Sequence, residues 1–454
     1  MTDLRTFIET VRTKRKADFV EVDREVQPIY ETAAIVTKLE ARGRSPMLLF
    51  RNVAGAEPTV VTNVCGSMGR LALALGCAVG DVAKVYAQRA EAPIAPRVVE
   101  QGACQEIVHR GEAVDLHRLP PMVYHLDDAK EPYLTAAIVL ARDPETGKTN
   151  LSYHRMMIAG RDRTGILMEK GKHLEGIFAK YVARGQDMPI AVILGVHPLV
   201  SLGTLYSGAA DVEELDVIGG LMQQPLDVVP CVSNPDLQVP AGAELVLEGT
   251  VSHTERMREG PFGEFTGYGT GVTQTPVFQV AAMTHRRDFL FQDIISGRME
   301  HLVLSMPAIE HRSRKMAAAL VPGFVNLALP APFTTVVAID KRDDAEPKRL
   351  IEAMLRADIY AKHVIVVDAD VDPGDLRAVM SAMALQTQAD QKVHILPDEL
   401  GTPLDPSCRS EDGRSAKMGI DATAALSSTR SVTRNRLPPE LLDAIDIKEF
   451  KAKR

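Results

Sequence analysis

The chain has 454 residues, of which 45% are hydrophobic and 25% are charged, a composition typical of a globular protein with two or three domains. Its net charge of −8 argues against a nucleic-acid partner, which would require a basic surface. Five scattered cysteines without a CxxC pair favour reduced thiols over a disulfide framework or a zinc site. Neither a signal-peptide core nor a bilayer-long apolar run is visible, so we expect a cytoplasmic protein without a membrane partner.

The first segment, residues 1–114, alternates helix and strand patterns. An amphipathic stretch at 4–11 is followed by ADFVEV, MLLFRNV and TVVTNV, which have strand composition. Between them, 31–42 has the spacing of a helix that stops at Gly43, and Asp81 is a suitable N-cap for a further helix. Short strands between helices predict an N-terminal α/β domain.

The second segment, residues 115–310, is dominated by strands joined by tight turns. YLTAAIVLA and NLSYHRMMIAG flank the turn RDPETGK, and VFQVAAMT and FLFQDII flank HRRD. Helical patterns interrupt the strands at 173–184 and 211–222. The pattern predicts a β-barrel domain with helical insertions.

The third segment, residues 311–454, returns to alternation, with strands expected at TTVVAID and KHVIVVDADV and helices between them. The predicted fold class is therefore α/β (α+β multidomain), with a C-terminal α/β domain that ends in a terminal helix. That helix, in PPELLDAIDIKEF, is too short to be stable alone, so we expect it to pack on a partner subunit in a homodimer or higher homo-oligomer. Its apolar residues are Leu441, Leu442, Ile445 and Phe450.

The most informative segment is ERMREGPFGEFTGY at 255–268, which carries two carboxylates, Glu259 and Glu264. The glycines and proline between them exclude a helix, and a straight strand would send the two side chains to opposite faces. A turn at 261–263 would let both reach one cavity, where the loop's phenylalanines would raise a carboxyl pKa and suit general acid catalysis. An exposed acidic loop tip is the alternative interpretation.

Together with NLSYHRMMIAG at 150–160, this loop resembles the UbiD family of decarboxylases, which use prenylated flavin mononucleotide (prenylated FMN). KMGIDAT near the C-terminus also matches the family's closing motif, and the resemblance covers nearly the whole chain. It implies a central split β-barrel that binds flavin. It also implies that an arginine and two glutamates surround the reactive flavin, and the matching residues are Arg155, Glu259 and Glu264.

The resemblance further implies a divalent metal that bridges the protein to the flavin phosphate. The matching ligands are Asn150, His173 and Glu214, a set without thiolate that suits Mn²⁺ or Mg²⁺ better than zinc; K⁺ is a further candidate cation. From the residues alone, their separations form no local metal motif, and a structural histidine remains the alternative.

Five side chains have roles that the residues alone leave open. Lys172 and Lys362 match positions that could reach the flavin phosphate, although an ordinary strand-edge lysine explains Lys362 as well. His154 and His301 could hydrogen-bond a ring heteroatom or phenolic oxygen of a substrate, or could be structural. Arg155 could hold a substrate carboxylate with two hydrogen bonds or pair with a glutamate, and its alternative is a surface ion pair.

The resemblance implies reversible, non-oxidative decarboxylation of a small aromatic or heteroaromatic acid, with α,β-unsaturated acids also candidates. Prenylated FMN would act as the electron sink, Arg155 and Glu259 would orient the carboxylate, and Glu264 would be the proton donor. A flavin prenyltransferase would supply the cofactor. Two alternatives stay open: a flavin-free, metal-dependent lyase or hydrolase with Glu264 as base, and a non-catalytic flavin-binding subunit.

Overall fold

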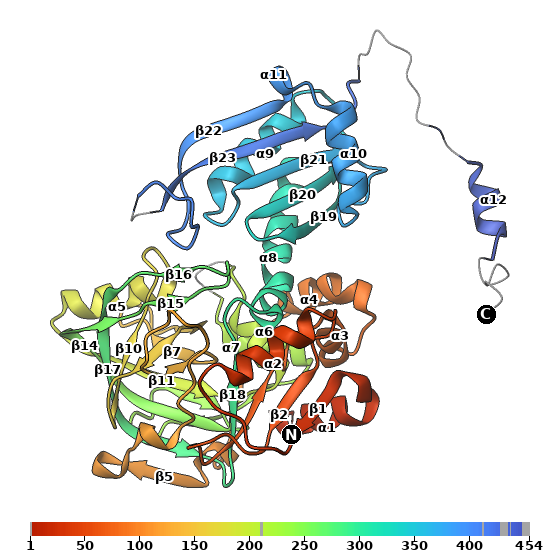
Figure 1. The fold of residues 1–454 in the computed structure, drawn as a ribbon. Coiled ribbons are helices and arrows are strands. Elements are labelled where there is room, and N and C mark those ends of the chain that lie inside the picture. Colours follow the sequence, from red (N-terminus) through yellow and green to blue (C-terminus); the bar gives the residue numbers. More distant parts are fainter. Residues whose placement is uncertain (1, 209–211, 411–412, 427–434, 436, 447–454) are drawn as a thin grey trace.

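The structure, a computed structural model, describes residues 2–208, 212–410, 413–426, 435 and 437–446. The chain folds into two lobes that are joined by the long helix α8 (Met299–Leu320), as Figure 1 shows. N-terminal and central residues form the larger lobe, and the residues after α8 form the smaller one. No helix in these described ranges is long and apolar enough to cross a membrane.

The N-terminal layer is a sheet in the order β1-β2-β3-β18, in which β18 returns from the end of the central region. The strand β18 pairs parallel with β3, so the N-terminal and central parts share one body. The apolar stripe of α1 is fully buried against this layer, as its spacing predicts. The elements are α1 (Leu4–Lys14), β1 (Phe19–Val22), α2 (Glu31–Glu40), β2 (Met47–Phe50), β3 (Thr59–Thr62), α3 (Met68–Leu75), α4 (Val82–Ala90) and β18 (Leu290–Asp293).

The central region is a strongly curved, largely antiparallel sheet in the order β6-β9-β10-β17-β14-β11-β7-β8, and β5 also pairs with β17. Alternate residues of β11 enter two different hydrophobic clusters, Ile190 and Val192 on one face and Ala191 and Ile193 on the other. The sheet is therefore buried on both faces at β11. Its strands are β5 (Ile107–Arg110), β6 (Tyr133–Leu134), β7 (Ile138–Arg142), β8 (Thr149–Tyr153), β9 (Met156–Ile158), β10 (Arg163–Ile166), β11 (Met188–Leu194), β14 (Leu245–Glu259) and β17 (Thr273–His285).

The described part of the central region also contains three α-helices and two small sheets. The helices expected at 173–184 and 211–222 are present as α5 and α7, and each begins with a predicted metal ligand. These additions are α5 (His173–Ala183), α6 (Pro198–Thr204), α7 (Glu214–Met222), the sheet of β4 (Arg97–Val98), β12 (Asp227–Pro230) and β13 (Gln238–Pro240), and the hairpin of β15 (Phe262–Gly263) and β16 (Gly269–Thr270).

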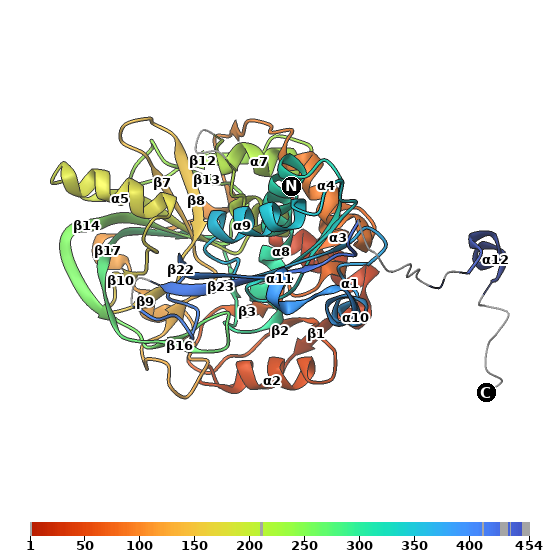
Figure 2. The same ribbon diagram turned by 90° about the horizontal axis from the view of Figure 1, so that it is seen from above.

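The smaller lobe is a sheet in the order β19-β20-β21-β23-β22 with helices on both faces. Val337 and Ile339 of β20 pack with α9, whereas Val336 and Ala338 pack with α10. In Figures 1 and 2, α12 lies away from both lobes. The elements are β19 (Phe324–Ala331), β20 (Thr334–Ile339), α9 (Glu346–Ala357), β21 (His363–Asp368), α10 (Leu376–Gln386), α11 (Ala389–Lys392), β22 (Val393–Leu400), β23 (Arg414–Ala422) and α12 (Pro439–Ala444).

This architecture confirms the predicted α/β (α+β multidomain) class with a curved central sheet. The boundary expected at residue 310 falls inside α8, which carries the chain from one lobe to the other. The division into three domains at 114 and 310 stays a prediction.

Candidate active site

The glutamate loop places Glu259 and Glu264 on two sides of one guanidinium. Strand β14 ends at Glu259, and the chain turns at Gly260, whose φ of +87° favours glycine. Arg155, between β8 and β9, donates from Nε and Nη2 to the two oxygens of Glu259 at 3.0 and 2.9 Å. Its Nη1 donates to Oε1 of Glu264. The turn that the sequence predicts therefore brings both carboxylates to the same cation.

Two aromatic side chains, Tyr133 and Phe262, contact the ion pair between Arg155 and Glu259. The Tyr133 hydroxyl donates to Oε1 of Glu259 at 2.9 Å and accepts the backbone N–H of Gly260 at 3.1 Å. The guanidinium carbon lies 5.2 Å from the ring centre of Phe262. Because the Glu259 side chain is fully buried and the Arg155 side chain is 8% exposed, each has its charge balanced inside the protein.

Glu264 has a different electrostatic environment from Glu259. Burial raises the pKa of Glu264, and the charge and hydrogen bond of Arg155 offset this only in part. A nearby carboxylate, Glu169, raises the pKa further. Glu264 therefore holds a proton to higher pH than an ordinary glutamate, as a general acid requires.

The loop is anchored by residues that the sequence analysis did not single out. Asp128 accepts the backbone N–H of Gly263 on Oδ1 at 2.7 Å, and its Oδ2 lies 3.0 Å from Nδ1 of His125. A Cβ at Gly263 would lie 2.5 Å from that same ring nitrogen, so any larger residue would force the His125 ring to move. The two consecutive aspartates at 127–128 were the available signal, but nothing local connects them to a loop more than a hundred residues away.

The structure brings Asn150 and Glu214 together across β8 and α7. Nδ2 of Asn150 donates to Oε1 of Glu214 at 3.1 Å, and the backbone N–H of Leu151 donates to Oε2 at 3.1 Å. Burial raises the pKa of Glu214 to about 7. A divalent cation would offset that burial, and amide and carboxylate oxygens are ligands that Mn²⁺ and Mg²⁺ accept, so the pair fits a hard metal ion.

The third predicted ligand, His173, is the first residue of α5 and its side chain is exposed. In the described part of the chain, the recorded hydrogen bonds join His173 to neither Asn150 nor Glu214. The described residues likewise contain no cluster of three or more His, Cys, Asp or Glu side chains that could hold a metal. The geometry thus assembles two of the three predicted ligands.

The remaining candidate residues are placed as follows. Nζ of Lys362 donates to Asp405 and Ser407 within the smaller lobe. Nζ of Lys172 lies 4.7 Å from the ring centre of Tyr360. Burial lowers the pKa of both His154 and His301 to about 4, so each is neutral at physiological pH.

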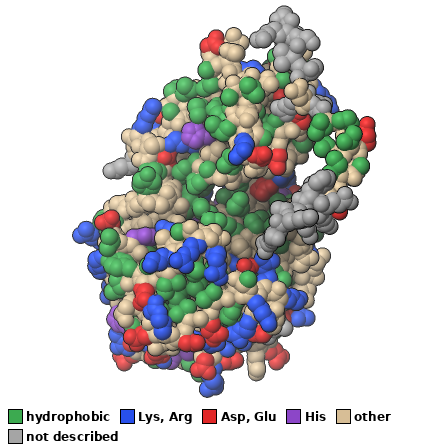
Figure 3. All heavy atoms as spheres, turned by 45° about the vertical axis from the view of Figure 1, so that its right-hand side comes forward, with side chains coloured by type: hydrophobic (Ala, Val, Ile, Leu, Met, Phe, Trp, Pro, Cys, Tyr) green, Lys and Arg blue, Asp and Glu red, His purple; other side chains and the backbone are tan. Residues whose placement is uncertain are grey.

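An aromatic cluster from both lobes adjoins the glutamate loop. The ring of Phe265, next to Glu264, lies 5.8 Å from His301 of α8, 5.6 Å from Phe333 and 6.2 Å from Tyr360. The Tyr360 hydroxyl donates to Oε2 of Glu169 in the larger lobe at 2.8 Å. Figure 3 shows hydrophobic side chains on the surface where the two lobes meet. The smaller lobe therefore contributes Phe333 and Tyr360 next to the loop that carries Glu264. Sequence reasoning missed these two side chains because they lie in connecting segments.

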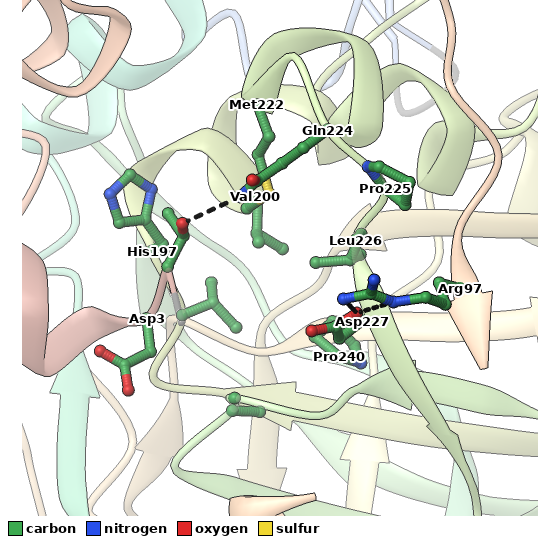
Figure 4. A pocket seen from close by; sticks show the side chains of 14 residues that line it. Asp3, Arg97, His197, Val200, Met222, Gln224, Pro225, Leu226, Asp227 and Pro240 are labelled. Carbon is green, nitrogen blue, oxygen red and sulfur yellow. Dashed lines mark hydrogen bonds and ion pairs between the residues drawn. The ribbon is translucent and has the colours of Figure 1, made fainter. Parts of the chain in front are cut away.

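A separate cavity of about 230 Å³ lies elsewhere in the larger lobe (Figure 4). Its lining includes Asp3, His197, Gln224 and the ion pair of Arg97 with Asp227. Because none of the described residues of the glutamate loop lines it, this cavity is distinct from the candidate active site.

Comparisons with known proteins show the family to which this chain belongs. Sequence profiles of the 3-octaprenyl-4-hydroxybenzoate carboxy-lyase family (UbiD) match the N-terminal domain at 12–90, the Rift-related domain at 97–299 and the C-terminal domain at 306–422. The chain is 31% identical over 417 residues to anhydromevalonate phosphate decarboxylase of Methanothermobacter thermautotrophicus, covering 91% of this chain and 96% of that protein. It is 30% identical over 444 residues to phenolic acid decarboxylase of Streptomyces sp. (strain D7), covering 93% and 92%.

Solved structures of UbiD-class enzymes also superpose on this chain. The UbiD-class enzyme HmfF from Pelotomaculum thermopropionicum in complex with FMN superposes with a TM-score of 0.89 at 35% identity, covering 99% of this chain and 100% of that one. An evolved dimeric form of HmfF in complex with prenylated FMN superposes with a TM-score of 0.85 at 33% identity, with the same coverage.

Proposed function

This chain belongs to the UbiD family of carboxy-lyases, and from that premise we propose that it catalyses the reversible, non-oxidative decarboxylation of an aromatic or heteroaromatic carboxylic acid. The observation that carries this proposal is one arginine held between two buried carboxylates, of which Glu264 has a raised pKa. Carboxylic acids with an α,β-unsaturated chain are further candidate substrates. The proposed cofactor is prenylated FMN, which supplies an electron sink for the charge left when carbon dioxide departs from an sp² carbon.

The residues of the chain would divide the work between binding and proton transfer. Two hydrogen bonds to Glu259 fix the guanidinium of Arg155, whereas Nη1 faces Glu264. When Glu264 is protonated, that third donor becomes available to the carboxylate of the substrate. Loss of carbon dioxide leaves an electron pair on carbon, and the proton of Glu264 then takes the place of the lost group. The reverse reaction uses the same carboxylate as the base.

Phosphate binding would rest on a metal ion. Asn150, His173 and Glu214 would hold Mn²⁺ or Mg²⁺ against the flavin phosphate, and the buried amide–carboxylate pair supports this assignment. Lys172 and Lys362 are proposed to assist at the phosphate, and K⁺ is a second candidate cation. The remaining partners in this proposal are a flavin prenyltransferase that makes the cofactor and further copies of the chain in a homo-oligomer, all in the cytoplasm.

The test is co-expression with a flavin prenyltransferase, followed by an absorption spectrum and an assay of carbon dioxide release from a panel of aryl, heteroaryl and acrylic acids. We expect flavin absorption, release of carbon dioxide from at least one acid, and incorporation of deuterium at the vacated carbon in D₂O. Colourless but folded protein would point to the flavin-free metal enzyme, and coloured protein that is inactive on the whole panel would point to the binding subunit.

A further inference from the structure

His154 lies one residue before Arg155, and its imidazole is hydrogen-bonded at both ring nitrogens. Nδ1 lies 2.8 Å from the carbonyl oxygen of Leu167, and Nε2 lies 2.8 Å from the hydroxyl of Ser152. The same hydroxyl is 3.3 Å from Oδ1 of Asn150. A chain of contacts therefore runs from His154 to the side chain predicted to ligate the metal.

The chemistry of these contacts fixes where each proton lies. A backbone carbonyl only accepts, so Nδ1 of His154 must carry the hydrogen. The ring is neutral because burial lowers its pKa to about 4, and Nε2 is then a bare acceptor. Ser152 has a single proton, and the acceptor at 2.8 Å takes it in preference to Oδ1 of Asn150 at 3.3 Å.

This arrangement leaves Oδ1 of Asn150 free of hydrogen on its Ser152 side. Nδ2 of the same amide is committed to Glu214 at 3.1 Å, which fixes the orientation of the amide group. Without an acceptor at position 154, the Ser152 hydroxyl would rotate and donate to Oδ1, where its proton would compete with a cation.

We propose that His154 is a positioning residue of the metal site, because its bare Nε2 draws the Ser152 proton away and keeps Oδ1 of Asn150 available to a divalent cation. The inference rests on the proposed function and deepens it. It also gives His154 a role that differs from a substrate contact, since both ring nitrogens are already engaged within the protein.

The test measures binding of Mn²⁺ to the full-length protein in the presence of FMN, from the electron paramagnetic resonance signal of the free ion. His154→Leu removes the acceptor and should weaken Mn²⁺ binding by about 10–100-fold, the usual cost of losing a group that orients a metal ligand. His154→Gln offers an NH2 donor group and a carbonyl acceptor, so it can replace both the N–H and the bare nitrogen of the neutral ring, and should restore affinity to within a few-fold of wild type. His311→Leu removes another buried histidine, next to Tyr86, and is the matched control. Melting temperatures show that each variant is folded.

A double-mutant cycle separates this role from a general packing effect. If His154 acts through the Ser152 proton, His154→Leu should cost much less in a Ser152→Ala background, where that proton is absent. An equal cost in both backgrounds, or failure of His154→Gln to restore binding, would overturn the inference while leaving the metal site intact. Wild-type protein that binds no Mn²⁺ would overturn the proposed metal site itself.

Discussion

Arg155 brings one positive charge to two buried carboxylates, so the site holds one negative charge more than it neutralises internally. Glu259 accepts two of the guanidinium hydrogen bonds and a third from the Tyr133 hydroxyl. Glu264 receives a single Arg155 donor and lies beside Glu169. The raised pKa of Glu264 relieves this excess charge by favouring a proton on that side chain, and the proposed proton donor is the carboxylate with fewer donors from Arg155.

Glu264→Gln should lower the turnover number by about 10²–10⁴-fold, because the amide keeps the shape of the side chain but has no proton to transfer. Since the pKa of Glu264 is raised, the wild-type rate should fall as the pH rises through that pKa, and the residual rate of the variant should lack this decline. Flavin and metal content should be unchanged. Glu259→Gln is the comparison, and its defect should include weaker substrate binding through Arg155. Near-normal deuterium incorporation by Glu264→Gln would show that Glu264 is not the proton donor.

Glu300 offers a second residue-level prediction, on stability. Its Oε1 accepts the backbone N–H of Cys65 at 2.7 Å, and burial raises its pKa to about 7 from an unfolded value of about 4.3. The folded state thus binds more protons than the unfolded chain between these values, and the stability contributed below about pH 4.3 is lost as the pH rises through about 7. Glu300→Gln keeps an acceptor and cannot ionise.

Urea denaturation of both proteins at pH 5 and pH 8 checks this prediction. From pH 5 to pH 8, wild type should lose stability that Glu300→Gln keeps. The difference in free energy of unfolding, variant minus wild type, should therefore increase by on the order of 2–3 kcal/mol. The same change at Glu255, an exposed residue of the same chain, is the control. A difference that stays constant with pH would show that Glu300 is ionised in the folded protein.

Hydrophobic periodicity in the sequence predicted helices and strands whose patterns are local. The helices at α5 and α7 were expected because their patterns are local. The approach of Glu214 to Asn150 joins residues 64 positions apart, and only the family resemblance indicated it. The contacts of Tyr133, Asp128 and Tyr360 were missed because each is a single polar group in a turn or strand end, and its partner is set by the folded topology.

The terminal helix α12 exposes apolar side chains that a partner subunit could cover. Leu441, Leu442 and Ile445 are 58%, 56% and 47% exposed, and burying each in a partner would contribute about 1.5–3 kcal/mol. Phe450, the fourth residue of the predicted stripe, lies outside the described residues. A chain shortened to end at Leu426 should therefore form smaller assemblies than the full chain, measured by light scattering at micromolar concentration. Leu441→Asp tests the same face without truncation, and an unchanged mass for both variants would separate α12 from assembly.

The two lobes meet next to the loop segment that carries Glu264 and Phe265. Helix α8 joins them and contributes His301, while Phe333 and Tyr360 come from connecting segments of the smaller lobe. Phe265 touches all three rings, so the position of the smaller lobe affects the surroundings of the neighbouring Glu264. The sequence predicted an α/β domain on each side of the central strands. It could not predict that the segments of Phe333 and Tyr360 lie against the loop of Phe265, because those contacts depend on how the two lobes pack together.

Tyr360→Phe tests whether the hydrogen bond between the lobes holds this arrangement. The change removes the donor to Glu169 at 2.8 Å and keeps the ring that stacks with Phe333 and lies under Lys172. A hydrogen bond to a charged group contributes about 1.5–3 kcal/mol, so the glutamate loop should exchange its amide hydrogens about 10–100-fold faster, with kcat/KM lowered and the melting temperature nearly constant. Tyr268→Phe, at a 63% exposed position of the same loop, should leave exchange unchanged. Equal exchange in Tyr360→Phe and wild type would mean that the aromatic contacts alone position the smaller lobe, and Phe333→Ala would then be the change that opens the site.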